Sequence, residues 1–359
     1  TEQPARDPTG RPPIKTAGRP APNSYKAGFR GGQEIAVDVR IGLLGASKIS
    51  RGAVIGPARV IPGTEVTRLA ARDAERARAF AEEHGIAGVE ADYAALVASD
   101  AVDLVYNGLP PSGHAEWTIR ALQAGKHVLC EKPFAMNADE VSAMLAAEAA
   151  SDAILIEAFH HRYHPLWHRL VELFRAGTIG EILEVEAMFD APIPYSPGEL
   201  RYDRALGGGA MMDLGCYPLH WARTVCASEP KVVSASADWH PSGVDITMRA
   251  ELEFPGGVTA CISSSMDEKR VHDYKATLAV LGTAGRIDVI NPLAPHAGHE
   301  LRIETNGKVA VEEVPGNSTY HHQLEWTLDA IAGGKVPLTG GDDSLGTMRA
   351  IDAIYSAAG

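Results

Sequence analysis

The chain has 359 residues, of which 45% are hydrophobic and 22% charged, which is ordinary usage for a globular protein with room for two domains. Its formal net charge of −13 argues against a nucleic-acid partner or an anionic membrane, because clustered Lys and Arg bind both. No apolar run approaches the roughly 20 residues that span a bilayer, and the N-terminus lacks a signal-peptide core, so we predict a cytoplasmic protein. Wide spacing of the cysteines predicts reduced thiols and no metal site; they are Cys130, Cys216, Cys226 and Cys261.

Residues 1–37 differ from the rest of the chain, because Pro and Gly are frequent and apolar periodicity is absent. Such a segment cannot build a core. We interpret it either as a disordered leader or as an arm that lies on the folded body or a neighbouring subunit, with no catalytic role.

From residue 37 the sequence alternates between short apolar runs and amphipathic runs. The apolar runs predict strands at residues 37–44, 65–71, 104–107 and 126–130. Helices are predicted after the first turn and at residues 73–85, 92–98, 115–124 and 138–150. This alternation predicts βαβ units around a parallel sheet, and we expect an α/β dinucleotide-binding domain of the Rossmann type over residues 38–160.

The turn Gly45-Ala46-Ser47-Lys48-Ile49-Ser50 follows the first strand, where such a domain places its glycine-rich loop. The full G-x-G-x-x-G pattern lets the backbone approach a pyrophosphate at a helix N-terminus. Only Gly45 matches, since Ser47 and Ser50 replace the second and third glycines. The position of the turn still favours a dinucleotide loop, with contacts from Gly45, Ala46, Ser47, Lys48 and Ile49.

The end of the second strand distinguishes the two nicotinamide cofactors. NAD sites place an acidic residue there for the ribose hydroxyls, whereas NADP sites place a cation near the 2′-phosphate. Here the strand ends in Ala71-Arg72, and Arg76 follows one helical turn later. We predict NADP, bound in part by Ala71, Arg72 and Arg76. NAD stays possible, because Asp73 is adjacent and both arginines can instead be solvated residues at a helix start.

Lys132 lies between Glu131 and Pro133 directly after a short apolar strand. Pro133 has no N–H to continue a strand, so the strand ends where Lys132 begins. Residues at strand ends line the crevices of open α/β sheets, which predicts a catalytic cation. A surface Lys-Pro turn is the alternative.

Four stretches together resemble the glucose-fructose oxidoreductase / inositol dehydrogenase (Gfo/Idh/MocA) family. They are residues 70–77, 109–117, 124–133 and 207–217, and the resemblance extends over residues 38–359. Within the family, Tyr217 and the Ala-Arg-Asp stretch resemble the branch that contains dihydrodiol dehydrogenase and NADP-dependent D-xylose dehydrogenase. Ser47 and Ser50 depart from the usual glycine pattern.

The resemblance implies an NADP-dependent oxidoreductase that transfers a hydride between the nicotinamide and a hydroxyl or carbonyl carbon of a sugar, cyclitol or related diol. It implies that Tyr217 is the proton donor or acceptor, Lys132 its electrostatic partner at the substrate oxygen, and Asp213 an anchor for a sugar hydroxyl. Further cofactor contacts are expected from Asn107, Leu109, Pro110, His114, Glu131, Lys132 and Arg162, and further substrate contacts from Arg201 and Tyr202. A dinucleotide-binding regulator without turnover is the alternative, but it has no use for both Lys132 and Tyr217.

Lys132 and Tyr217 complement each other chemically. A tyrosine has a pKa of about 10 and is a poor base at neutral pH, but a nearby ammonium group stabilises the phenolate and lowers that pKa. If residues 210–223 are helical up to a break at Pro218, Asp213 and Tyr217 lie four apart on one face and reach the same cleft. For Asp213, a charge interaction with the helix N-terminus is the alternative. We interpret the histidines as mostly structural rather than metal-binding; they are His160, His161, His164 and His168.

The resemblance also implies a second, α+β domain with a large open, mostly antiparallel sheet, assigned to residues 161–359. Consecutive strand patterns at 182–189, 232–237, 244–254, 258–264, 274–282 and 285–290 agree with it. In such proteins the free face of this sheet often forms the subunit interface, which implies a homodimer or a higher homo-oligomer. The other expected partner is a small polyol or sugar.

Overall fold

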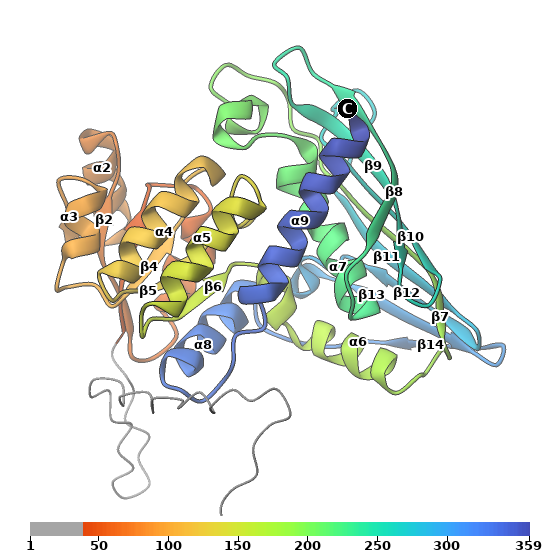
Figure 1. Cartoon of the computed structure of the whole chain (residues 1–359). Helices are drawn as coiled ribbons and strands as arrows, with labels where there is room; N and C mark the ends of the chain where they lie inside the picture. Colours follow the sequence, from red (N-terminus) through yellow and green to blue (C-terminus); the bar gives the residue numbers. More distant parts are fainter. Residues whose placement is uncertain (1–38) are drawn as a thin grey trace, which may run out of the picture. The chain divides into compact units, whose positions relative to one another are not determined.

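The computed structural model describes residues 39–359, so the leader expected at 1–37 and the first two residues of the first predicted strand lie outside the described residues. The first sheet has six parallel strands in the order β3-β2-β1-β4-β5-β6 (Figure 1). Its strands are β1 (Val39–Leu44), β2 (Thr64–Ala70), β3 (Gly88–Val89), β4 (Leu104–Asn107), β5 (His127–Cys130) and β6 (Leu155–Glu157). The chain changes direction across the sheet between β1 and β4, which is the switch point where such sheets bind ligands.

Helices connect these strands and confirm the predicted Rossmann-type alternation. They are η1 (Arg51–Ile55), α1 (Gly56–Ala58), α2 (Ala74–His84), α3 (Tyr93–Ala98), η2 (Pro111–Gly113), α4 (His114–Gln123) and α5 (Ala138–Ala149). Local signals set the ends of α2. The Asp73 side chain accepts hydrogen bonds from the backbone N–H groups of Glu75 and Arg76, and Gly85 ends the helix in the left-handed conformation, with φ of 68°.

The strands of the first sheet bury both faces. Ile41 and Leu43 of β1 pack in one hydrophobic cluster with Phe80 of α2, whereas Leu44 packs in the other with Leu96 of α3. Successive residues of a strand point to opposite faces, so helices must cover both sides. The cluster around Ile41 also contains Leu324 of α8 (Thr319–Ile331), so a helix from the end of the chain completes the first sheet. The domain boundary at residue 160 stays a prediction.

The second sheet has eight strands in the order β14-β13-β12-β11-β7-β10-β9-β8. They are β7 (Ile182–Asp190), β8 (Lys231–Trp239), β9 (Asp245–Phe254), β10 (Val258–Ser265), β11 (Lys275–Gly282), β12 (Gly285–Ile290), β13 (Glu300–Thr305) and β14 (Lys308–Glu312). Only β7 and β10 pair in parallel, which confirms the mostly antiparallel sheet. The sequence patterns missed β13 and β14; β14 exposes four of its five residues, so no buried face marks it.

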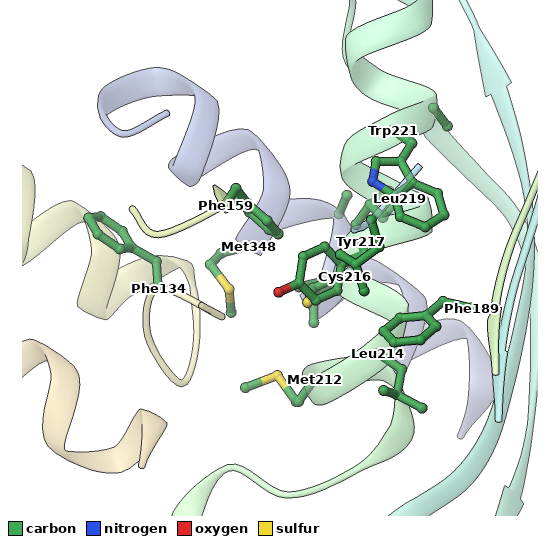
Figure 2. Packing of buried hydrophobic residues seen from close by; sticks show 14 of the residues in the cluster. Phe134, Phe159, Phe189, Met212, Leu214, Cys216, Tyr217, Leu219, Trp221 and Met348 are labelled. Carbon is green, nitrogen blue, oxygen red and sulfur yellow. The ribbon is translucent and has the colours of Figure 1, made fainter. Parts of the chain in front are cut away.

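Helices pack on one face of this sheet. The remaining helical elements are η3 (His160–Tyr163), α6 (Pro165–Arg175), η4 (Leu200–Tyr202), η5 (Arg204–Leu206), η6 (Met211–Gly215), α7 (Cys216–Cys226), η7 (Pro295–Ala297) and α9 (Gly341–Ala358). Figure 2 shows the apolar packing around α7, with Tyr217 near Phe159 and Phe189. Among residues 39–359, no helix is both long and apolar enough to cross a membrane.

The expected helix break at Pro218 is wrong. The π-helical turn η6 runs directly into α7, and Pro218 is the third residue of α7, which continues to Cys226. Pro218 has no N–H to donate, and the carbonyl of Asp213, five residues before it, accepts from Lys132 Nζ instead. Single turns of the π type inside helices are frequent at functional sites.

Candidate active site

The turn after β1 has the conformation that a dinucleotide loop needs. Gly45 has a φ of +91°, which favours glycine, and its N–H donates to the Ala70 carbonyl at 2.8 Å. Ser50 is fully buried, and its Oγ donates to the Ser47 carbonyl at 2.7 Å. A small serine thus fits where the fingerprint has its third glycine, and it also ties the turn to the helix that follows. Lys48 and Ile49 are exposed at the turn, whereas Ala46 is buried.

The turn after β4 lies against the first one. A Cβ atom on Gly108 would come within 3.0 Å of Ser47 Oγ, and one on Gly45 would come within 3.2 Å of Leu109 Cδ2. Asn107 is buried, and its amide nitrogen donates to the His114 carbonyl and to Thr118 Oγ1, both at 3.2 Å. The turns after β1 and β4 therefore lie against each other at the switch point. The predicted cofactor contacts from Gly45 to Ile49 and from Asn107 to Pro110 belong to these two turns.

His114 and Glu131 support the backbone of this region. The His114 ring nitrogens lie 3.0 Å from the Pro133 carbonyl oxygen and 2.7 Å from that of Leu109, and burial lowers the pKa of His114 to about 4. Glu131 accepts a hydrogen bond from Tyr106 at 2.7 Å and one from the Lys132 N–H at 3.3 Å, and burial raises its pKa. These polar groups are engaged within the protein, and their contact with a cofactor stays a prediction.

The residues at the end of β2 fit a dinucleotide phosphate. Arg76 donates to the Ala46 carbonyl at 2.8 Å, which brings the predicted arginine to the glycine turn. Arg72 is exposed and forms no ion pair with any residue in the range 39–359, while Asp73 Oδ1 accepts the two N–H groups that it caps at the start of α2. Ser47 Oγ is buried without a hydrogen-bond partner in the same range. An exposed guanidinium at the end of β2 and an unpaired hydroxyl in the glycine turn are compatible with a bound nicotinamide dinucleotide.

Lys132 forms a partly buried ion pair at the carboxyl end of β5. Its Nζ donates to Asp213 Oδ1 and to the Asp213 carbonyl oxygen, both at 2.8 Å. Burial alone would lower the pKa of Lys132, but the charge and hydrogen bonds of Asp213 outweigh it and raise that pKa. Lys132 is therefore a paired, partly buried cation and not part of a surface Lys-Pro turn.

Asp213 is the centre of this cluster. Its Oδ2 accepts from Arg201 Nε at 2.5 Å, and Arg201 also pairs with Glu199 at 2.9 Å. Burial would raise the pKa of Asp213, but Lys132 and Arg201 lower it strongly. The carboxylate is thus already paired with two cations, and this arrangement orients Lys132. Its predicted role as an anchor for a sugar hydroxyl is untested.

The expected effect of Lys132 on Tyr217 is wrong. The lysine Nζ lies 5.0 Å from the centroid of the Tyr217 ring, but burial raises the pKa of the phenol well above its usual range. Asp213 already neutralises the ammonium charge, and apolar neighbours surround the ring: its centroid is 5.5 Å from that of Phe159 and 5.8 Å from that of Phe189 (Figure 2). Tyr217 is accordingly protonated at neutral pH.

His160 is the site residue that sequence reasoning missed. Its Nε2 lies 3.2 Å from the Tyr217 hydroxyl oxygen, and its Nδ1 lies 2.7 Å from Thr319 Oγ1. The run of histidines to which it belongs favours a structural interpretation and gives no spacing signal towards Tyr217. Thr319 is 159 positions away in the chain, so only the fold brings the two together.

Two predicted residues do not join the Lys132 cluster. The Tyr202 hydroxyl donates to the Ile193 carbonyl at 2.7 Å, and Tyr202 is buried, so this side chain holds a loop. Burial lowers the pKa of Arg162, with Asp343 as the nearest opposing charge, and no hydrogen bond joins this guanidinium to a residue in the range 39–359. The substrate contact of Tyr202 and the cofactor contact of Arg162 stay predictions.

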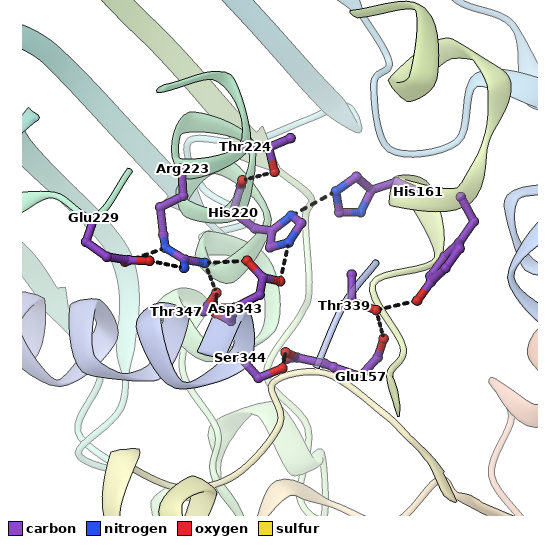
Figure 3. A network of polar contacts seen from close by, with 11 residues as sticks. Glu157, His161, His220, Arg223, Thr224, Glu229, Thr339, Asp343, Ser344 and Thr347 are labelled. Carbon is purple, nitrogen blue, oxygen red and sulfur yellow. Dashed lines mark hydrogen bonds and ion pairs between the residues drawn. The ribbon is translucent and has the colours of Figure 1, made fainter. Parts of the chain in front are cut away.

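The neighbouring His161 belongs to a separate polar network (Figure 3). Its Nε2 lies 3.3 Å from His220 Nδ1, and His220 Nε2 lies 3.1 Å from Asp343 Oδ2. Arg223 pairs with the same aspartate at 3.1 Å. This network connects α7 with the start of α9 and supports the structural interpretation of His161.

Two family descriptions match this chain. One, an oxidoreductase family with an NAD-binding Rossmann fold, covers residues 39–159, and the other, the GFO/IDH/MocA C-terminal domain, covers residues 167–288. The chain belongs to the Gfo/Idh/MocA family. The predicted family is confirmed, and the protein is an oxidoreductase of this family.

Proteins of known activity are similar to this chain along most of its length. D-xylose 1-dehydrogenase (NADP(+)) 2 of Haloferax volcanii is 36% identical over 320 residues, which cover 88% of this chain and 96% of the relative. Trans-1,2-dihydrobenzene-1,2-diol dehydrogenase of Xenopus tropicalis is 33% identical, with 76% of this chain and 81% of the relative covered. The solved structure of a 3-ketoreductase from Actinomadura kijaniata in complex with NADP and TDP-benzene is 31% identical, has a TM-score of 0.82, and covers 89% of this chain and 98% of that chain. The predicted branch is confirmed by the first two.

Proposed function

We propose that this Gfo/Idh/MocA protein is an NADP(H)-dependent oxidoreductase that acts on a hydroxyl or carbonyl carbon of a sugar, cyclitol or related diol. The observation that carries the proposal is the partly buried Lys132–Asp213 pair beside Tyr217, at the sheet edge that also carries the Gly45 turn. The three relatives named for this chain are all enzymes, which favours turnover over the alternative of a dinucleotide-binding regulator.

Bound NADP(H) would supply or accept the hydride. The Gly45 turn, Ser47, Arg72 and Arg76 are the residues that would hold it. Support for NADP over NAD comes from the exposed Arg72 guanidinium at the end of β2, where a 2′-phosphate would find a cation. The neighbouring Asp73 uses its Oδ1 to cap α2.

Lys132 and Tyr217 have different roles at the substrate oxygen. An ammonium group has three N–H donors, and Lys132 gives two of them to Asp213, which leaves one for a substrate oxygen. This donor stabilises the negative charge that develops on the oxygen as a carbonyl is reduced. Tyr217 keeps its proton at neutral pH because burial raises its pKa, so it can give that proton to the same oxygen.

We further propose that the protein works in the cytoplasm as a homodimer or higher homo-oligomer. Hydrophobic side chains at half exposure or more lie on strands of the second sheet, among them Val233, Ile290, Val309 and Val311. The proposal rests on the family resemblance, which assigns the free face of this sheet to the subunit interface. Light scattering of the purified protein would give the oligomeric state, and a monomer at micromolar concentration would contradict this part.

The first experiment is a fluorescence titration with NADPH and NADH, followed by a screen of aldoses, ketoses, inositols and vicinal diols at the nicotinamide absorbance. Tighter binding of NADPH, with turnover of at least one of these compounds, would support the proposal and name the substrate class. Binding without turnover would instead favour the regulator, and absence of binding would contradict the assignment of the Gly45 turn.

A further inference from the structure

His160 lies between the Tyr217 hydroxyl and a buried threonine. Its Nε2 is 3.2 Å from the Tyr217 hydroxyl oxygen, and its Nδ1 is 2.7 Å from Thr319 Oγ1. The Tyr320 ring packs on the imidazole with 4.2 Å between the ring centroids, which holds the ring in this orientation. Among residues 39–359, His160 is the one hydrogen-bond partner of the Tyr217 hydroxyl. Whether His160 offers this hydroxyl a donor or an acceptor therefore decides where the phenol proton points.

His160 carries a neutral imidazole at physiological pH. Burial has the largest effect, and Lys132 and His296 add to it, so that the pKa of His160 falls to about 3. His161 and Tyr320 are the other titratable groups that face the ring, besides Tyr217. A neutral imidazole carries one proton, so one ring nitrogen donates a hydrogen bond and the other accepts one. Two arrangements with Tyr217 and Thr319 follow, one for each tautomer.

In one arrangement, the Thr319 hydroxyl accepts from His160 Nδ1, and His160 Nε2 accepts from the Tyr217 hydroxyl. The Thr319 hydroxyl proton then has no acceptor among residues 39–359, because His160 is the one partner of this hydroxyl there. Thr319 has no exposed surface, and a buried donor without an acceptor costs free energy. The Tyr217 proton would also point to His160 and not to a substrate.

In the other arrangement, the Thr319 hydroxyl donates to His160 Nδ1, and His160 Nε2 donates to the Tyr217 oxygen. Of the protons on these three groups, only that of the phenol then lacks an acceptor within residues 39–359. Tyr217 keeps 4% of its surface exposed, and Lys132 Nζ lies 5.0 Å from the centroid of its ring, so this proton is at the substrate site. The second arrangement pairs the sealed hydroxyl and leaves free the proton that a substrate can accept.

We propose that Thr319 fixes the tautomer of His160, so that Nε2 donates to the Tyr217 oxygen and the phenol proton faces the substrate. The inference rests on the proposed oxidoreductase function. Thr319 is the first residue of α8, and its N–H donates to His296 Nδ1 at 3.3 Å, which fixes the threonine from a second side. His160 and Thr319 are positioning residues, because they act on the reaction through Tyr217.

The arrangement supports the transfer of one proton to a substrate carbonyl. During hydride transfer to the carbonyl carbon, the electron pair of the C=O π bond moves to the oxygen. The Tyr217 O–H bond breaks, and its proton bonds to that oxygen. The phenolate keeps the hydrogen bond from His160 Nε2, whose proton stays on the nitrogen and stabilises the negative charge. After product release, water in the emptied site returns a proton to Tyr217, since Lys132 and Asp213 there keep 13% and 22% of their side-chain surface exposed.

Nitrogen NMR of the wild-type protein with ¹⁵N-labelled histidine tests the tautomer without any turnover. Protonated and unprotonated ring nitrogens resonate far apart, and the signals of His160 are those that disappear in His160→Gln. At neutral pH we expect a protonated Nε2 and an unprotonated Nδ1. A proton on Nδ1, alone or together with one on Nε2, would overturn the proposal. Thr319→Val should give a mixture of both tautomers, whereas Thr319→Ser should keep the wild-type spectrum of His160.

Single-turnover rates with NADPH and a sugar that the wild type reduces test whether the donor matters. His160→Leu removes the donor, and we expect the rate to fall about 100-fold, as for a misplaced catalytic group. His160→Gln keeps an amide N–H near the position of Nε2, so its rate should stay within about tenfold of the wild type. Thr319→Val should also lose about tenfold, and Thr319→Ser should match the wild type. The dissociation constant for NADPH should stay unchanged in all four variants.

The failure of this inference and the failure of the proposed function give different results. Equal losses in His160→Gln and His160→Leu, or in Thr319→Ser and Thr319→Val, would overturn the inference while the proposed function stands. A wild-type protein with the expected tautomer that reduces no sugar would overturn the proposed function, and the catalytic use of the tautomer with it. If a His160 variant fails to fold, the ring signals that change in Thr319→Val identify His160, and the Thr319 pair decides.

Discussion

The residues that form the turn after β1 lie much closer together in the sequence than the residues that form the cluster around Lys132. The turn uses a short stretch of the chain: Gly45 follows β1, Ser50 bonds back to Ser47, and Arg76 reaches Ala46 from α2, 30 positions away. The cluster draws Lys132 from β5, Asp213 and Tyr217 from the η6–α7 junction, His160 from η3 and Thr319 from α8. Under the proposed function, the cofactor is therefore recognised by groups from one part of the chain, whereas the chemistry uses groups that the fold assembles from distant elements.

Replacement of Lys132 should have the largest effect. Lys132→Met removes the donor to the substrate oxygen and leaves Asp213 with Arg201 as its remaining cation. We expect kcat to fall by about 1000-fold, as for loss of a preorganised electrostatic donor. Steady-state kinetics at saturating NADPH measures it, with the exposed Lys231→Met as the matched control. A fall in kcat of less than tenfold would contradict a catalytic role of Lys132.

Asp213→Asn should have the next largest effect, and it should depend on pH. Asp213 is what raises the pKa of Lys132 against the opposing effect of burial, so its neutralisation lowers that pKa. The variant should lose its active ammonium form as pH rises through the lowered value, whereas the wild type keeps it. We expect kcat at neutral pH to fall about 100-fold. A pH profile of kcat checks it, and a profile that still matches the wild type at alkaline pH would contradict this role of Asp213.

Arg72→Ala tests the exposed region. Loss of hydrogen bonds to a charged phosphate, worth about 1.5 to 3 kcal/mol, should weaken NADPH binding by roughly 10- to 100-fold. Binding of NADH, which lacks the 2′-phosphate, should change less than about twofold. Fluorescence titration of both cofactors measures the difference. Arg78→Ala is the control, because Arg78 is exposed on α2, the helix that follows Arg72. Equal loss for NADPH and NADH would mean that Arg72 does not select the phosphate.

Tyr202→Phe should have the smallest effect on activity. The variant leaves the Ile193 carbonyl without its hydroxyl donor, which should lower the free energy of unfolding by about 1 to 3 kcal/mol. Turnover should stay within about twofold of the wild type, because the hydroxyl is already engaged in the loop. Denaturant unfolding and kinetics of the same preparation measure both. A tenfold rise in KM with unchanged stability would instead support the predicted contact between Tyr202 and the substrate.

Local signals explain the parts that the sequence predicted well. The ends of α2 follow from Asp73 and Gly85, which act on the backbone within one turn of themselves. The strand before Lys132 ends at a proline for an equally local reason. By contrast, β14 was missed because it buries almost nothing, and α8 was not expected under the first sheet because no local pattern marks which sheet a helix covers.

The sequence alone determined the alternation of strands and helices, the place of the Gly45 turn after the first strand and the place of Lys132 at a strand end, because each depends on residues a few positions apart. Only the tertiary structure decided which charge faces Lys132 and which base faces Tyr217. Asp213 pairs with the Lys132 ammonium group, which was expected to lower the pKa of Tyr217. Burial of the phenol raises that pKa instead. His160 and Thr319 lie 159 positions apart in the chain, and the dielectric environment and partners of a side chain depend on such distant contacts.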